Sequence, residues 1–211
     1  MGELMKMTRE DFAYFILPAL LWPIVFIVLR SKFVYAMLVA ALCLAAFTLY
    51  GYRDRIKFSY RKANYASILL LGTIGSVALY LAFLIGYYAT VLLGLSSYVS
   101  SIYTMLYSQG AALAVAPILI LIGISEEIYW RGGLQGYIRK NSKVFANKAW
   151  LGSALWYGAV HLLTLNPILA LSAFVVGIIT GLIAERYGIL VSSVTHIIWL
   201  IAIVLVIPIG I

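Results

Sequence analysis

The sequence predicts an all-α membrane protein, in which about seven transmembrane helices form one integral membrane domain over residues 1–211. Three observations predict this class: the composition, the length of the apolar runs and the distribution of charge. Hydrophobic residues make up 64% of the chain, charged residues only 10%, and the mean hydropathy is +1.05. Ordinary soluble domains carry roughly 25% charged residues. A soluble fold could not hide this much apolar surface, so the soluble classes are excluded.

Seven apolar runs are candidates for membrane-spanning helices, each of which needs about 20 predominantly apolar residues. They are Phe12–Leu29, Phe33–Gly51, Tyr65–Leu93, Ala111–Tyr137, Ala149–Leu165, Pro167–Glu185 and Ile189–Ile209. The polar segment before the first run lacks a cleavage site, so we expect this run to be a retained span. The short link 30–32 predicts that the first two runs form a helical hairpin.

The later runs differ in length and in the residues that they contain. The third and fourth are longer than a bilayer requires, which predicts that they tilt or protrude. Between them, the uncharged stretch 96–110 is rich in Ser and Tyr and is expected to form an interfacial loop. The sixth run contains Gly177 and Gly181, a spacing of small residues that permits close packing of helices.

The basic residues predict the orientation of the chain. The net charge of +8 could indicate nucleic-acid binding, but in a chain of apolar spans it indicates topology, and no nucleic-acid partner is expected. Seven spans place only Arg30 and Lys32 on one side. The other side carries Lys6, Arg9, Arg53, Arg55, Lys57, Arg61, Lys62, Arg139, Lys140, Lys143, Lys148 and Arg186. Because basic residues collect in cytoplasmic loops, the N-terminus is predicted to be cytoplasmic, in the plasma membrane of a prokaryote.

Four titratable side chains lie inside apolar runs, where charge is costly. They are Glu126, Glu127, His161 and His196, and Arg131 follows closely. A charged residue at the centre of a bilayer costs about 2.5–3.5 kcal/mol on insertion scales, so such residues usually face the interior of the bundle and carry function. With a rise of about 1.5 Å per residue, all four reach a similar depth, in or near the cytoplasmic half. This predicts one shared polar site.

Local helix geometry assigns different directions to the two glutamates. Adjacent helical residues point about 100° apart, so Glu126 and Glu127 cannot face the same point. Glu127 and Arg131 are four residues apart and can pair along the helix, which leaves Glu126 free to face the histidines. Gly132 and Gly133 are expected to weaken the helix or to let another element approach closely.

Three short motifs then carry a resemblance to a known family. They are EEIYWR from Glu126 to Arg131, YGAVH from Tyr157 to His161, and HIIWL from His196 to Leu200. In this order and inside apolar runs, they resemble the motifs of the CAAX protease and bacteriocin-processing family, which includes the type II CAAX prenyl endopeptidases. The resemblance covers roughly residues 120–200 of an expected catalytic core at about 111–205. The helices at about 12–93 are generic.

The resemblance implies hydrolysis of peptide bonds within the membrane, at a site reached from the cytoplasmic side. It implies that Glu126 activates water with help from His161, and that His196 donates to the oxyanion of the intermediate. Glu127 and Arg131 would hold these elements in place. The expected partners are membrane lipids and a membrane-associated or C-terminally lipidated peptide substrate.

The sequence leaves several alternatives open. Leu200 stands where the family often has Asn, so another donor such as Thr195 or a backbone N–H would have to substitute, or activity would be weak or absent. Glu126, His161 and His196 could also form a zinc set, although a metal-free glutamate mechanism is favoured. A proton-coupled transporter and a non-catalytic scaffold or immunity-type protein are the competing functions.

Overall fold

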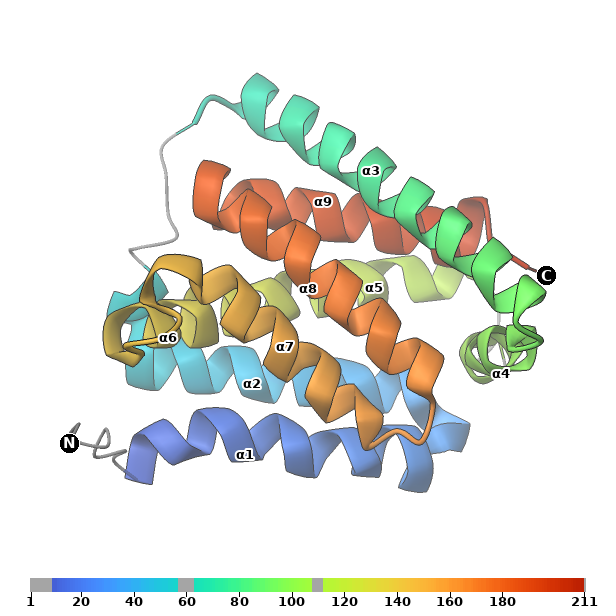
Figure 1. Cartoon of the computed structure of the whole chain (residues 1–211), viewed down its shortest axis with the longest axis horizontal. Helices are drawn as coiled ribbons and strands as arrows, with labels where there is room; N and C mark the ends of the chain where they lie inside the picture. The colour runs from blue at the N-terminus through green and yellow to red at the C-terminus, as the bar shows by residue number, and fades with distance from the viewer. Residues whose placement is uncertain (1–8, 57–62, 108–111, 211) are drawn as a thin grey trace.

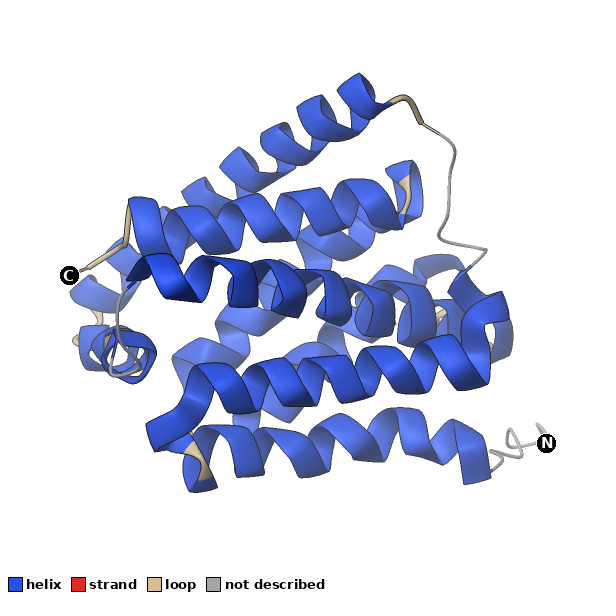
Figure 2. Ribbon diagram, turned by 180° about the vertical axis from the view of Figure 1, so that it is seen from behind, coloured by secondary structure: helices blue, strands red, loops and turns tan. Residues whose placement is uncertain are grey.

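The structure is a computed structural model, and it describes residues 9–56, 63–107 and 112–210. Within these ranges the chain is almost entirely helical and contains no strand (Figures 1 and 2). The predicted class, a helical membrane protein, is confirmed. Part of the topology prediction depends on basic residues that lie outside the described residues, namely Lys6, Lys57, Arg61 and Lys62.

The helices follow one another with short connections. In chain order they are α1 (Arg9–Pro23), α2 (Phe33–Ile56), α3 (Tyr65–Leu92), α4 (Ser96–Tyr107), α5 (Ala112–Glu127), α6 (Gln135–Asn141), α7 (Ala149–Leu162), α8 (Pro167–Tyr187) and α9 (Ile189–Ile201). Short π-helices follow α1 (Ile24–Val28), join α5 to α6 (Ile128–Leu134) and extend α9 (Ala202–Val206). Single 3₁₀ turns occupy Arg30–Lys32 and Ala146–Lys148.

The packing of the helices agrees with two predictions made from spacing. α1 and α2 lie side by side and are joined by the turn Arg30–Lys32, as the predicted hairpin requires (Figures 1 and 2). On α8, a Cβ added to Gly177 would lie 2.8 Å from the Cα of Ala154 on α7. A Cβ at Gly181 would lie 3.2 Å from the Cβ of Trp150. The small residues therefore let α7 and α8 approach closely.

The predicted count of seven spans is not confirmed. Four helical segments of the described chain are long and apolar enough to cross a membrane: Arg30–Gly51, Tyr65–Leu92, Pro167–Tyr187 and Ile189–Val206. The segment Phe12–Val28 is apolar but shorter. The predicted fourth run is divided by the π-helix at Ile128–Leu134, and α7 has only 14 residues. The π-helix begins directly after the two glutamates of the first motif, and α7 ends one residue after the histidine of the second motif.

The stretch expected to be an interfacial loop contains a helix instead. α4 lies across one end of the bundle and is seen end-on in Figure 1. Its Ser100 and Thr104 hydroxyls bond back to main-chain oxygens of the same helix, those of Ser96 and Ser100. Tyr103 is buried and donates to the main-chain oxygen of Ile203. An uncharged sequence can therefore form a helix here, because its hydroxyl groups find acceptors within the helix and on the segment that follows α9.

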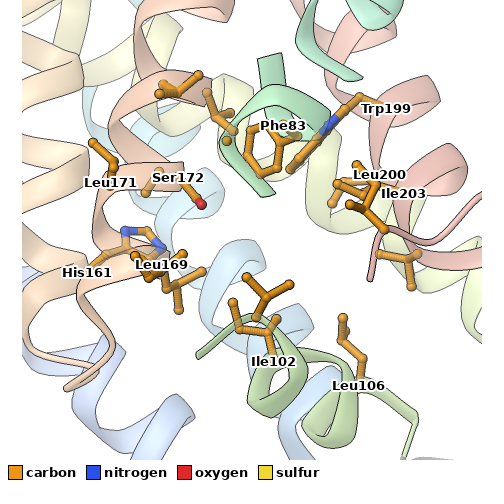
Figure 3. A pocket seen from close by; sticks show the side chains of 18 of the residues that line it. Phe83, Ile102, Leu106, His161, Leu169, Leu171, Ser172, Trp199, Leu200 and Ile203 are labelled. Atoms are coloured by element: carbon orange, nitrogen blue, oxygen red, sulfur yellow. The ribbon is translucent and has the colours of Figure 1, made fainter. Parts of the chain in front are cut away.

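The two ends of the bundle differ in charge and in what they enclose. The described basic loops, with Lys143 and Arg186, lie at the end that holds the N-terminus and α6 (Figure 1). At the opposite end, α4 helps to line a cavity of about 270 Å³. The second half of α3, the end of α7, the first half of α8 and the second half of α9 also line it, together with residues of α5 and of the first hairpin (Figure 3). The cavity therefore extends from the middle of the bundle toward the end that is poor in basic residues.

Candidate active site

The two glutamates are followed by a local widening of the helix. Residues Ile128–Leu134 form a π-helix, a form that is frequently found at functional sites. A Cβ at Gly133 would lie 2.8 Å from the Oγ1 of Thr48 on α2, and one at Gly132 would lie 3.1 Å from Ile56. These glycines therefore stand where the helix is irregular and where α2 approaches it closely, as the sequence predicted.

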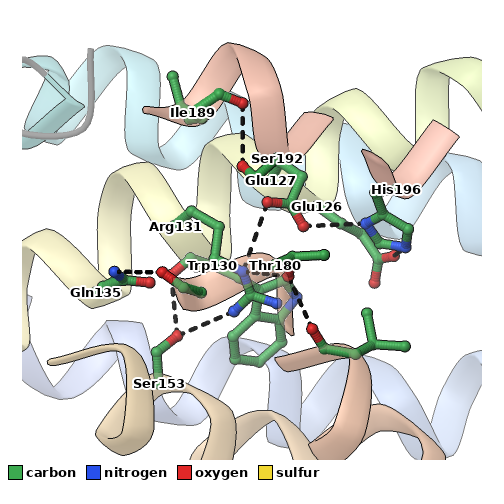
Figure 4. Close-up of polar contacts among 12 residues, drawn as sticks. Glu126, Glu127, Trp130, Arg131, Gln135, Ser153, Thr180, Ile189, Ser192 and His196 are labelled. Carbon is green, nitrogen blue, oxygen red and sulfur yellow. Dashed lines mark hydrogen bonds and ion pairs between the residues drawn. The ribbon is translucent and has the colours of Figure 1, made fainter. Parts of the chain in front are cut away.

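Arg131 is the buried anchor of the site. Its Nε lies 3.5 Å from Oε2 of Glu127, and both side chains are fully buried. The guanidinium also donates to Thr180 on α8 at 2.8 Å and to Ser153 on α7 at 3.3 Å (Figure 4). One side chain thus joins three segments of the chain, and the spacing of four residues correctly predicted that Glu127 and Arg131 meet.

His196 lies between the two glutamates. Its Nδ1 is 3.0 Å from Oε1 of Glu127, and its Nε2 is 3.7 Å from Oε2 of Glu126 (Figure 4). All three side chains are at least nine-tenths buried. The end of α5 and α9 therefore bring together acid and imidazole groups that are 69 and 70 residues apart in the sequence. If Glu127 accepts from Nδ1, the Nε2 of His196 is left to face Glu126 and the cavity.

Tyr157 holds the second oxygen of Glu126. Its hydroxyl donates to Oε1 of Glu126 at 3.1 Å, and its ring packs edge-on against His161 with centroids 4.7 Å apart. In the sequence, Tyr157 is only the first residue of the second motif. Its hydroxyl was the available signal, since a buried phenol needs a polar partner.

His161 has neutral partners on both ring nitrogens. Nδ1 lies 2.7 Å from the main-chain oxygen of Tyr157, one turn earlier on α7. The indole Nε1 of Trp22 donates toward the ring and lies 2.8 Å from Nε2. Trp22 belongs to α1, which was interpreted as generic, and no local pattern marks a contact between residues 139 positions apart. The first helix therefore contributes to the site.

One cavity gathers these groups. Glu126, Tyr157, His161 and His196 all line it, and most of the remaining wall is apolar. In Figure 3, His161 lies across the cavity from Trp199 and Leu200. Thr195, named as a substitute donor, faces away, because its hydroxyl donates to the main-chain oxygen of Gly72 on α3 at 3.2 Å. That expectation was wrong: adjacent residues on α9 point to different sides, so Thr195 packs against α3 while His196 faces the site.

A comparison with family models agrees with the resemblance that the three motifs carry. Residues 108–202 match the family described as Type II CAAX prenyl endopeptidase Rce1-like. Over this stretch the chain is similar to the CAAX protease and bacteriocin-processing family. The match contains all three motifs of the CAAX protease family and most of the cavity wall contributed by α5 and α7 to α9. Comparisons with curated proteins and with solved structures gave no significant match.

The zinc set predicted from the sequence was Glu126, His161 and His196. Among the described residues, no three His, Cys, Asp or Glu side chains are close enough to hold a metal ion. Both ring nitrogens of His161 also face other partners, whereas zinc needs a free imidazole lone pair. As arranged here, the three residues do not fit a zinc site.

Proposed function

We propose that this protein is an intramembrane endopeptidase that hydrolyses peptide bonds of membrane-associated or lipidated substrates. The observation that carries the proposal is the Glu126 carboxylate, which lines an apolar cavity with one oxygen held by Tyr157 and the other turned toward His196. A buried carboxylate with a fixed orientation and access to a cavity is suited to general-base catalysis.

The proposed reaction uses Glu126 to activate a water molecule. Glu126 takes one proton as the water oxygen forms a bond to the scissile carbonyl carbon, and the carbonyl oxygen becomes an oxyanion. When the tetrahedral intermediate collapses, the carbon–nitrogen bond breaks and Glu126 returns the proton to the leaving amine. A base close to the reacting water commonly contributes about 10²–10⁴-fold to such a reaction.

The two histidines take different parts in the proposal. His196, beside Glu126, donates from Nε2 to the oxyanion, while Glu127 holds its Nδ1. The ring of His161 forms part of the opposite wall, against which the substrate packs, and the Trp22 indole and the Tyr157 carbonyl hold this ring in place. Glu127 and Arg131 act as positioning residues because they fix His196 and the π-helical segment.

We propose a metal-free glutamate mechanism, supported by the poor fit of the three candidate ligands to zinc. Metal analysis of the purified, active protein tests this point. Stoichiometric zinc whose removal by a chelator abolishes cleavage, and whose return restores it, would overturn the glutamate mechanism while leaving the endopeptidase function intact.

Cleavage of a peptide library by the purified protein in detergent or vesicles tests the function. We expect wild-type protein to cleave, and Glu126→Gln to lower turnover by at least about 10²-fold, because the general base is lost. Glu185→Gln is the matched control, since Glu185 pairs with Arg139 and does not line the cavity. Equal behaviour of wild type and Glu126→Gln would refute the protease hypothesis and favour a scaffold or transporter.

The cavity bears on the predicted localisation, which combines a cytoplasmic N-terminus with an active site in the cytoplasmic half. We propose that the basic end faces the cytoplasm, in accordance with the positive-inside rule. In this orientation the cavity would extend from mid-membrane toward the opposite side. Substrate would therefore enter from the non-cytoplasmic side or from the membrane.

Labelling of single cysteines in intact cells tests this orientation. In a Cys43→Ser background, a membrane-impermeant maleimide should label Ser97→Cys on α4 and spare Lys143→Cys until the cells are opened. Both positions are exposed at the surface of the protein. The reverse pattern would place the cavity on the cytoplasmic side and overturn the proposed orientation.

A further inference from the structure

The wall of the cavity beside His196 carries a buried indole N–H that has no acceptor. Trp199 follows His196 by one helical turn on α9, and the two ring centroids lie 5.8 Å apart. Trp199 is only 7% exposed and lines the cavity. Its Nε1 has no hydrogen-bond partner within the described part of the chain. Burying such a donor without an acceptor costs free energy, which a bound acceptor would recover.

The position in the cavity distinguishes Trp199 from the other buried tryptophans. The Nε1 atoms of Trp130 and Trp156 also have no acceptor among the described residues, but neither residue lines the cavity. The indole of Trp22 is already engaged with His161. Of the unpaired indoles in the described ranges, Trp199 is thus the one that lines the cavity.

Neighbouring side chains hold the indole of Trp199 in place and supply no other hydrogen-bond donor beside His196. The ring of Phe83 on α3 packs edge-on against Trp199 with centroids 4.6 Å apart, which restricts rotation of the indole. Leu200, the next residue and another part of the cavity wall, can donate no hydrogen bond. The hydroxyl of Thr195 is used on Gly72. A second donor beside His196 must therefore come from elsewhere.

We propose that Trp199 is a catalytic residue that donates its indole N–H to the oxyanion of the tetrahedral intermediate, together with His196. This inference rests on the endopeptidase function proposed above. Glu126 lies 3.7 Å from His196, and His196 lies beside Trp199, so base and donors follow one another along one wall. Water held at Glu126 would attack a carbonyl whose oxygen points toward the imidazole and the indole.

The hydrogen bond transfers no proton and strengthens as negative charge develops on the oxygen. It therefore acts on the transition state more than on the bound substrate, and its loss should lower kcat while KM changes little. Removal of one oxyanion donor typically lowers turnover by about 10²–10³-fold.

The sharpest test replaces only the N–H of Trp199. Site-specific incorporation of benzothienylalanine puts sulfur in place of the indole nitrogen and keeps the size of the ring, so packing on Phe83 is preserved. We expect this protein to lose about 10²–10³-fold in kcat with little change in KM. Trp199→Phe should lose as much or more, whereas Trp156→Phe, which also removes an unpaired indole N–H, should retain wild-type turnover.

A binding measurement gives a second readout that does not depend on turnover. A peptide whose scissile carbonyl is a hydrated difluoroketone carries the tetrahedral oxygen, and a matched peptide carries an ordinary amide. In a Glu126→Gln background, benzothienylalanine at position 199 should weaken binding of the first peptide and leave binding of the second unchanged. Equal effects on both peptides, or no effect on either, would overturn the role of Trp199.

The outcomes separate this inference from the proposed function. If wild type cleaves, Glu126→Gln does not, and the protein with benzothienylalanine keeps full kcat, then only the role of Trp199 fails. If wild type and Glu126→Gln behave alike, the endopeptidase function fails and the role of Trp199 fails with it.

Discussion

The two histidines of the site are buried to a similar degree but are held in opposite ways. His196 on α9 lies between the carboxylates of Glu127 and Glu126, at 3.0 and 3.7 Å. His161 on α7 has neutral partners, the main-chain oxygen of Tyr157 and the indole of Trp22. The same residue type thus meets two different surroundings, one ionic and one neutral.

The surroundings of each histidine extend this difference. The region of His196 is an ionic cluster, in which Glu127 and Arg131 join the π-helical segment to α7 and α8 through Ser153 and Thr180. The region of His161 is aromatic. Trp22, Phe26 and Tyr157 pack their rings edge-on against the imidazole. The stability of the region around His196 should therefore depend on paired charges. The stability of the region around His161 should depend on the packing of rings and on single hydrogen bonds.

The largest effect should come from breaking the ionic cluster. Arg131→Met leaves Glu127 as a buried charge without its cation, and removal of one partner from a buried pair typically costs about 3–5 kcal/mol of folding free energy. The double variant Glu127→Leu, Arg131→Met should recover much of this loss, because no unpaired charge remains. Ser153 and Thr180 keep main-chain partners in both variants. Denaturant unfolding in detergent micelles measures these differences.

Arg139→Met is the control for that experiment. Its ion pair with Glu185 has side chains that are 32% and 31% exposed, and such pairs contribute about 0.2–1 kcal/mol. If Arg131→Met cost no more than Arg139→Met, the ionic cluster would not be what holds the region of His196.

A smaller effect should separate the two histidines directly. His196→Leu removes the partner of a buried carboxylate, and an unsatisfied buried group costs about 1–3 kcal/mol, more when it is charged. His161→Leu leaves unpaired only the neutral N–H of Trp22 and a main-chain oxygen, so we expect a smaller loss. Thermal unfolding of both variants under the same conditions measures the contrast. Equal losses would mean that the charge near His196 does not distinguish the two regions.

The smallest effect should follow removal of the contact between α1 and His161. Trp22→Phe keeps an aromatic ring and removes one hydrogen bond, which is worth about 0.5–1.5 kcal/mol. If the indole positions His161 for catalysis, kcat should fall by up to about tenfold while KM is unchanged. Kinetics on a cleaved peptide measure both constants, with Trp156→Phe as control. A rise in KM alone would show that Trp22 shapes the cavity and does not position the catalytic ring.

Much of the fold and part of the site follow from local pattern. The apolar runs predict a helical membrane protein, and the spacing of Glu127 and Arg131 predicts their contact, because both depend on residues close in sequence. The count of spans was less accurate, since composition does not reveal a π-helix or a short α7. The helix α4 was missed because the hydroxyl groups that suggest a loop find acceptors within the helix or on the segment that follows α9.

The sequence by itself determined that the chain is a helical membrane protein. It also singled out Glu126, Glu127, His161 and His196, because an ionisable group inside an apolar run is costly and the runs can be found from the sequence. Only the tertiary structure decided the partners: Tyr157 for Glu126, Trp22 for His161, and an unpaired indole at Trp199 beside His196. The physical reason is that the direction of a buried side chain depends on which helices pack against it. That packing joins residues far apart in the chain and leaves no mark in local spacing.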